Sequence, residues 1–143
     1  MRRHRAATAL VAWTFLVWTT RIANIWRDAD LATGERWGRT LLAVSFTVLA
    51  IAAGVALWRR LLQATVVAVG ALAAWTIAVW AVRGVGILAG DHDPGFKAVH
   101  TVLAVVSIVL AVLAWRETRR EARREASGPA PATSGPVPAE RRG

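Results

Sequence analysis

Four long runs without a charged residue, separated by clusters of charge, most constrain what this chain can fold into. The runs are Ala6–Thr20, Thr40–Trp58, Leu61–Val82 and Ala98–Trp115. An α-helix rises about 1.5 Å per residue, so a hydrocarbon core of about 30 Å needs roughly 20 residues. The last three runs reach this length within tolerance. The first run reaches it if its helix continues past Arg21 to Trp26, with the Arg21 side chain extended to the lipid headgroups.

The same runs argue against a soluble helical core. A helix on the surface of a soluble protein has a polar face with a period of 3.6 residues, but Leu61–Val82 contains only Gln63, Thr65 and Thr76 as polar side chains. A cleaved signal peptide is the alternative for the first run. No small-x-small cleavage site precedes Arg21, which favours a retained anchor. We therefore predict an all-α integral membrane protein that forms a compact four-helix bundle.

The distribution of basic residues predicts the orientation in the membrane. The chain has 18 Lys and Arg against 9 Asp and Glu, a net charge of +9, and one lysine among the bases. Four spans put both termini on one side, and 12 of the bases lie on that side against six on the other. The positive-inside rule therefore places both termini in the cytoplasm. Because the arginine bias indicates a bacterial genome, we expect the bacterial cytoplasmic (inner) membrane.

An internal duplication is the most specific pattern in the sequence. Residues 9–21 match residues 71–83 at eight of 13 positions, including two tryptophans and an arginine. The following spans also match, as in residues 40–44 against 101–105, and each reaches a Trp-Arg pair. We predict a transmembrane domain over residues 1–126, made of two tandem-duplicated hairpins at about residues 6–60 and 61–126. Two hairpins in the same orientation would be related by a pseudo-two-fold axis along the membrane normal.

Small residues at four-residue spacing predict which helix faces pack together, because they let backbones approach closely. The expected contact positions are Ala43, Thr47, Ala50 and Gly54 in the second span, Gly70, Ala74 and Ala78 in the third, and Ala104, Ser107, Ala111 and Ala114 in the fourth.

Four tryptophans occupy matching places in the two repeats. Trp18 and Trp80 each stand three residues before an arginine, at an expected depth near the headgroups. Interfacial anchoring of the helix is the favoured interpretation of these two, and a cation–π contact with the arginine is the alternative. Trp13 and Trp75 lie deeper and are expected to pack between the repeats.

The fourth span should continue as a charged helix to Ala126. Glu117–Arg120 and Glu121–Arg124 are spaced as i,i+3 pairs. Its arginines are expected to contact anionic lipids of the inner leaflet, at about 1 kcal/mol per close base; they are Arg116, Arg119, Arg120, Arg123 and Arg124. Residues 127–143 are rich in proline and alanine and are predicted to be a disordered tail. A dozen helical residues beside a bilayer do not indicate nucleic-acid binding.

The two outer loops hold the candidate metal ligands. Two Asp-x-Asp pairs come from matching loops with two histidines nearby, and around a two-fold axis they could bind a divalent cation. The candidates are Asp28, Asp30, Asp91, Asp93, His92 and His100. The alternative is that these acids cap helices and pair with nearby bases, with Asp93-Pro94 starting the fourth span.

The motifs that would indicate an enzyme are missing from the sequence. It has no cysteine, no HExxH, no phosphate-binding glycine loop and no nucleophile–base spacing. The hydrocarbon depth carries no acidic or basic residue, which argues against a proton-coupled transporter. We therefore expect a non-catalytic accessory, assembly or scaffolding subunit without a cofactor, packed against itself or another membrane protein. The alternatives are a small channel or transporter formed by oligomers and an outer-face cation-binding protein.

Overall fold

The structure, a computed structural model, describes residues 4–128 of the chain. It consists of four α-helices, which are α1 (Arg5–Arg27), α2 (Thr33–Trp58), α3 (Leu62–Ala89) and α4 (Pro94–Ala126). Most of the predicted disordered tail, residues 129–143, lies outside the described residues, and so do Arg2 and Arg3.

The lengths of the helices agree with four membrane spans. All four are long and apolar enough to cross a bilayer. α1 continues past Arg21 to Arg27, and α4 continues to Ala126, so both predicted extensions are confirmed. Large apolar side chains remain exposed on the helices, with Leu41 at 65% and Val67 at 70% exposure. Such a surface suits contact with lipid rather than with water.

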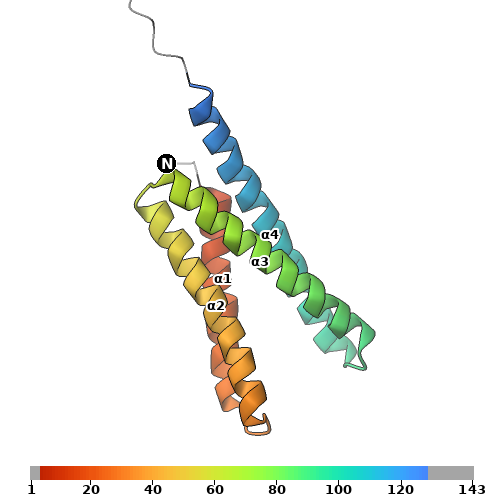
Figure 1. Cartoon of the computed structure of the whole chain (residues 1–143). Helices are drawn as coiled ribbons and strands as arrows, with labels where there is room; N and C mark the ends of the chain where they lie inside the picture. The colour runs from red at the N-terminus through yellow and green to blue at the C-terminus, as the bar shows by residue number, and fades with distance from the viewer. Residues whose placement is uncertain (1–3, 129–143) are drawn as a thin grey trace, which may run out of the picture.

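The helices form a ring in which each contacts two neighbours. α1 packs against α2 and α4, and α3 packs against α2 and α4. Figure 1 shows the hairpins α1–α2 and α3–α4 crossing at an angle and separating toward the loops that join the helices of each hairpin. We call that end of the bundle the loop end. The opposite end, where α1 begins and α2 turns into α3, is the termini end.

The core is built largely from small side chains, as expected for α2 and α4. Ala43 and Ala50 of α2 and Ala111 of α4 are fully buried. In α3 the prediction holds for Gly70, which packs against Trp115 of α4, and is wrong for Ala74 and Ala78, which are exposed. α3 instead turns a face with larger apolar residues to the core, where they gain van der Waals contacts with the other helices; its buried residues are Thr65, Val69, Leu72, Ala73, Thr76 and Trp80.

The buried face of α1 recurs in α3. The buried positions Ala7, Leu10, Thr14 and Trp18 of α1 each have a buried counterpart 62 residues later, namely Val69, Leu72, Thr76 and Trp80. The buried threonines even make the same bond, because each hydroxyl donates to the carbonyl oxygen four residues earlier, at 2.8 and 2.7 Å. The two helices therefore present equivalent faces to the core.

A tight turn joins α2 to α3 at Arg59 and Arg60, as the charge pattern predicted. The Leu61 N–H donates to the Ala56 carbonyl at 3.1 Å, and the Arg60 N–H donates to the Leu57 carbonyl at 3.2 Å. These two bonds make a Schellman motif, which places Arg60 at φ 55°. Glycine is usual at this position because it has no Cβ. Arg60 thus places a long cationic side chain at a position whose backbone conformation favours a residue without a side chain.

Candidate functional site

The six predicted cation ligands lie around two separate loops at the loop end. Figure 1 shows the α1–α2 and α3–α4 loops apart from each other. Among residues 4–128, no three His, Asp or Glu side chains are grouped closely enough to hold a metal ion. The structure therefore does not bring the six residues together, and cation binding by them stays a prediction; the six are Asp28, Asp30, Asp91, Asp93, His92 and His100.

Two of these acids have local structural partners. The Asp93 carboxylate accepts from the Gly95 N–H at 2.8 Å and caps α4, with Pro94 in its first turn. The Asp28 carboxylate accepts from the N–H of Asp30 at 3.2 Å. Both contacts are of the kind that orders turns and helix starts. The expectation that Asp93 and Pro94 begin the fourth helix is confirmed.

His100 has a different partner from the one a metal site would need. Its Nδ1 lies 2.9 Å from the Phe96 carbonyl oxygen and its Nε2 lies 3.5 Å from the Arg21 guanidinium. In the neutral ring Nδ1 therefore donates and Nε2 accepts. The Arg21 side chain points to α4, and the expectation that it extends to the lipid headgroups stays a prediction. Arg39 and Arg83 lie within electrostatic range of Arg21, so three helices contribute a base to this region.

Each loop is held by a basic residue from the start of its second helix. The Arg36 guanidinium donates to the Asp28 carbonyl oxygen at 2.8 Å, and the Lys97 ammonium donates to the Leu88 carbonyl oxygen at 3.3 Å. Arg36 also lies over the Trp26 ring, 5.9 Å from its centroid. Both bases neutralise carbonyl groups near a helix C-terminus, where positive charge is stabilising.

Trp18 and Trp80 are core residues rather than interfacial anchors. Their exposures are only 4% and 7%. Trp18 stacks on Phe46, with ring centroids 4.0 Å apart. The cation–π contacts in the described part of the chain involve other tryptophans. Both interpretations of these two residues were wrong, because the bundle turns this face of α1 and α3 inward.

Trp13 and Trp75 each bridge to a helix of the other hairpin. The Trp13 indole N–H donates to the Ser107 hydroxyl at 2.9 Å, from α1 to α4. The Trp75 indole N–H donates to the Ser45 hydroxyl at 3.0 Å, from α3 to α2. A hydrogen bond at membrane depth satisfies a polar group that lipid cannot. Both tryptophans thus contact the other hairpin, as predicted, although Trp75 is 39% exposed.

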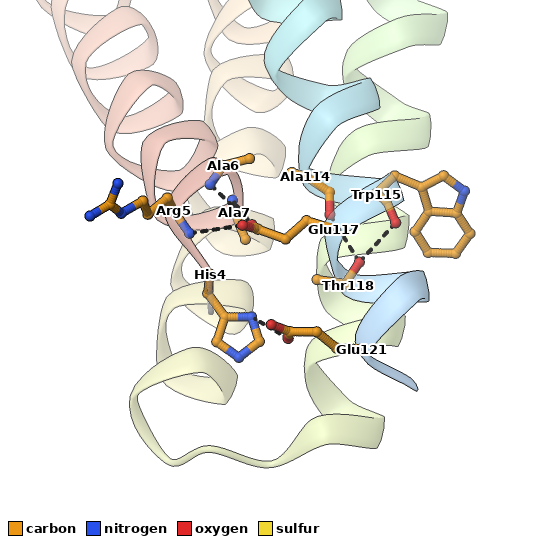
Figure 2. A network of polar contacts seen from close by, with 9 residues as sticks. All are labelled: His4, Arg5, Ala6, Ala7, Ala114, Trp115, Glu117, Thr118 and Glu121. Carbon is orange, nitrogen blue, oxygen red and sulfur yellow. Dashed lines mark hydrogen bonds and ion pairs between the residues drawn. The ribbon is translucent and has the colours of Figure 1, made fainter. Parts of the chain in front are cut away.

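The most extensive polar network lies at the termini end, where α4 caps α1. The Glu117 carboxylate accepts three backbone N–H bonds, from Arg5 at 3.1 Å, Ala6 at 3.0 Å and Ala7 at 3.1 Å. Figure 2 shows its side chain reaching from α4 to the first turn of α1. These N–H groups have no partner within the helix, and the helix dipole attracts a negative charge there. One side chain of α4 thus does the work of a local N-cap, which His4 does not supply.

His4 and Glu121 extend this network by one turn. Nδ1 of His4 lies 3.0 Å from Oε2 of Glu121, and both side chains are partly shielded from solvent. In Figure 2 the histidine ring and the carboxylate face each other below the Glu117 cap. The two acids therefore face α1. The predicted pairs Glu117–Arg120 and Glu121–Arg124 are wrong, because no such ion pair is present in the described chain and α1 takes both carboxylates.

The opposite side of this part of α4 is basic and free. Its arginines are all exposed, and they are Arg116, Arg119, Arg120, Arg123 and Arg124. Arg119 lies over the Trp115 ring, 5.3 Å from its centroid. Thr118 is fully buried on the inner side and donates to the Ala114 carbonyl oxygen at 3.0 Å. The helix is therefore divided into an acidic face that contacts α1 and a basic face whose arginines form no ion pair within residues 4–128.

Sequence reasoning missed the role of His4, Glu117 and Glu121. The acids had basic neighbours at helical spacing, so local pairing was the obvious interpretation. One signal was available, because the first turn of α1 contains no acid and its N-cap position holds His4 rather than Ser, Thr, Asp or Asn. A helix start without a cap requires a partner from elsewhere, and only the fold can identify it.

Comparisons with known proteins give no relative. The chain matches no protein-family model, and no curated protein or solved structure is detectably similar to it.

Proposed function

We propose that this chain is a non-catalytic membrane protein whose transmembrane bundle holds the end of α4 upright as a rigid basic platform. In this proposal it acts as an accessory or assembly subunit of the bacterial inner membrane. The platform consists of the exposed arginines of α4, namely Arg116, Arg119, Arg120, Arg123 and Arg124.

One observation carries the proposal, and it is the attachment of α4 to the start of α1. α4 runs unbroken for 33 residues. The part from Arg116 to Ala126 would extend roughly 16 Å beyond the bilayer at about 1.5 Å per residue. Glu117 and Glu121 hold this part against α1. An unattached helix of this length would be marginal in water, so the attachment serves to fix the direction of the basic face.

The chemistry of the platform favours anionic contacts. Arginines close to an anionic leaflet attract it by about 1 kcal/mol each. Those farther from the membrane can pair bidentately with carboxylates of a protein partner. The large apolar surface of the helices gives the same partner, or a second copy of the chain, an area to contact within the bilayer.

The duplication is also part of the proposal. The cross-hairpin bonds Trp13–Ser107 and Trp75–Ser45 are related by exchanging the two hairpins. The repeat of buried positions at 62 residues supports the same relation. We infer two like-oriented copies of one hairpin about a pseudo-two-fold axis normal to the membrane.

Orientation can be tested directly because the chain contains no cysteine. We expect a single cysteine replacing Asp30 to react with a membrane-impermeant maleimide added to intact cells. We expect one replacing Arg59 to react only after the membrane is opened. The opposite pattern would place the platform outside and end the proposal.

The platform itself is tested by photo-crosslinking of the full chain in native membranes. A photoreactive amino acid at Arg123 should give a discrete protein adduct, whereas one at the lipid-facing Val109 should give lipid adducts only. Changing the five platform arginines to glutamine should remove the protein adduct, and changing them to lysine should keep it. Lipid adducts alone at Arg123 would contradict the accessory role.

A further inference from the structure

An open groove at the termini end lies beside the capping network and shares only Arg124 with the platform. It runs between the start of α1, the α2–α3 turn and the C-terminal part of α4, with a volume of about 1450 Å³. Pockets for small organic ligands typically measure roughly 300–1,000 Å³. The groove is therefore large enough for part of a lipid molecule.

The lining of the groove changes from charged to apolar. Arg5, Arg60 and Arg124 are at its charged part, and Val11, Gly54 and Leu57 are among its apolar lining. Arg5 and Arg60 stand at or beyond the helix ends, whereas Val11 and Gly54 lie one to two turns inside α1 and α2. Leu57 lies between these levels, one residue before the end of α2. The groove thus has bases at headgroup level and apolar residues at hydrocarbon level.

The charge balance of the groove is positive. Two acids also line it, but Glu121 contacts His4 at 3.0 Å, which leaves Glu125 opposite three arginines. No hydrogen bond or ion pair occupies the guanidinium groups of these three arginines within residues 4–128. Space of this kind inside a bilayer cannot stay empty, and its apolar part is unfavourable for water.

We propose that this groove binds one anionic phospholipid. Its phosphate would pair with Arg5 and Arg60, and an acyl chain would lie along Val11, Gly54 and Leu57. Gly54 has no side chain to fill this part of the groove, where an added Cβ would be in ordinary contact with Val11 at 3.6 Å. The proposal also gives a reason for an arginine at this left-handed position of the turn. The backbone conformation there favours glycine, so the benefit of arginine must come from its side chain.

The test uses the full chain in detergent with three added probes. Phosphatidylglycerol carries the charge and the chains, phosphatidylcholine with the same chains carries no net charge, and inorganic phosphate carries the charge alone. Native mass spectrometry counts retained lipid, and a thermal melt follows stabilisation. We expect a single retained phosphatidylglycerol and a higher Tm with that lipid alone. Equal effects of phosphatidylcholine, or of phosphate without lipid, would overturn the proposal.

Matched variants separate the groove from general surface charge. Arg60→Gly should weaken phosphatidylglycerol binding about fivefold, the usual factor for one base near an anionic lipid, while the turn relaxes and the fold is kept. Arg5→Gln combined with Arg60→Gln should weaken it about 25-fold on the same basis. Arg59→Gln removes the same charge one residue away, outside the groove lining, and should leave binding unchanged. Equal weakening by Arg59→Gln and Arg60→Gly would show surface attraction and contradict the groove. The platform arginine Arg124 is untouched in all of these, so failure here is distinct from failure of the platform.

Discussion

In each hairpin one glycine lies at the contact between the two helices, on α2 in the hairpin α1–α2 and on α3 in the hairpin α3–α4. In the first hairpin Gly54 of α2 faces Val11 of α1, and a Cβ on it would find its nearest atom at 3.6 Å. In the second hairpin Gly70 of α3 lies under the Trp115 ring of α4, and a Cβ would come within 2.4 Å of that ring. The space around the glycine therefore differs between two similar helix pairs, because a large aromatic ring covers Gly70 and none covers Gly54.

The hairpins also differ at the start of their first helices. Glu117 accepts three N–H bonds from the first turn of α1. For α3, no side chain of the described residues caps its start and its first turn holds no acid. A residue of the second hairpin therefore caps the first helix of the first hairpin, whereas no described residue of the first hairpin caps α3. Stability at the termini end should depend on the first helix more than on the third.

The largest expected effect is at the tight contact. Gly70→Ala should lower the free energy of unfolding by about 1–3 kcal/mol, because overpacking forces the Trp115 ring or the helix to move. Gly54→Ala is the matched control and should be neutral or stabilising, since alanine favours a helix by roughly 0.5–1 kcal/mol. Unfolding of the purified protein in detergent measures both. Equal responses of the two variants would remove the distinction between the hairpins, and Gly70→Ala with Trp115→Leu should recover stability.

Loss of the tertiary cap should have an effect of comparable size. Glu117→Ala should destabilise the protein by about 1.5–3 kcal/mol, the range for hydrogen bonds to a charged group. Glu117→Gln should recover part of this, because its amide oxygen still accepts. Hydrogen exchange should show faster opening of the first turn of α1, with the start of α3 unchanged. Glu125→Ala, on the exposed part of the same helix, is the control and should change stability by less than about 0.5 kcal/mol.

The cross-hairpin bonds should have a smaller effect. Ser107→Ala should cost about 1 kcal/mol by leaving the partly buried Trp13 N–H without its partner. Ser45→Ala should cost less, because Trp75 is more exposed. Double variants with Trp13→Phe or Trp75→Phe would measure the coupling in each pair. A larger loss for Ser45→Ala would reverse the expected order of the two bonds.

The smallest effect should be a gain. Arg60→Gly should stabilise the α2–α3 turn by up to about 1 kcal/mol, because glycine adopts the left-handed conformation without strain. Arg59→Gly is the control and should destabilise slightly, since Arg59 has an ordinary φ of −76°. A loss of stability in Arg60→Gly without added lipid would mean that the Arg60 side chain supports the fold itself.

Much of the architecture follows from the sequence alone. Run length between charges predicts four helices, and the extensions past Arg21 and Trp115 follow because a helix continues until a breaker or cap ends it. The start of α4 at Asp93 and Pro94 and the turn at Arg59 and Arg60 are also determined by residues that are neighbours in the sequence. These features depend on hydropathy and on neighbouring residues, so no knowledge of the packing is needed to predict them.

Tertiary structure decided the partners of side chains that had more than one possible neighbour. Glu117 had arginines within reach on its own helix, yet it caps α1, because unpaired N–H groups and a helix dipole bind a carboxylate more strongly than an exposed arginine does. Trp18 carried the signals of an interfacial residue, yet the angle of the bundle turns it onto Phe46. Hydropathy is a property of a segment, whereas a contact depends on rotation and distance between segments, and those are set only when all four helices pack together.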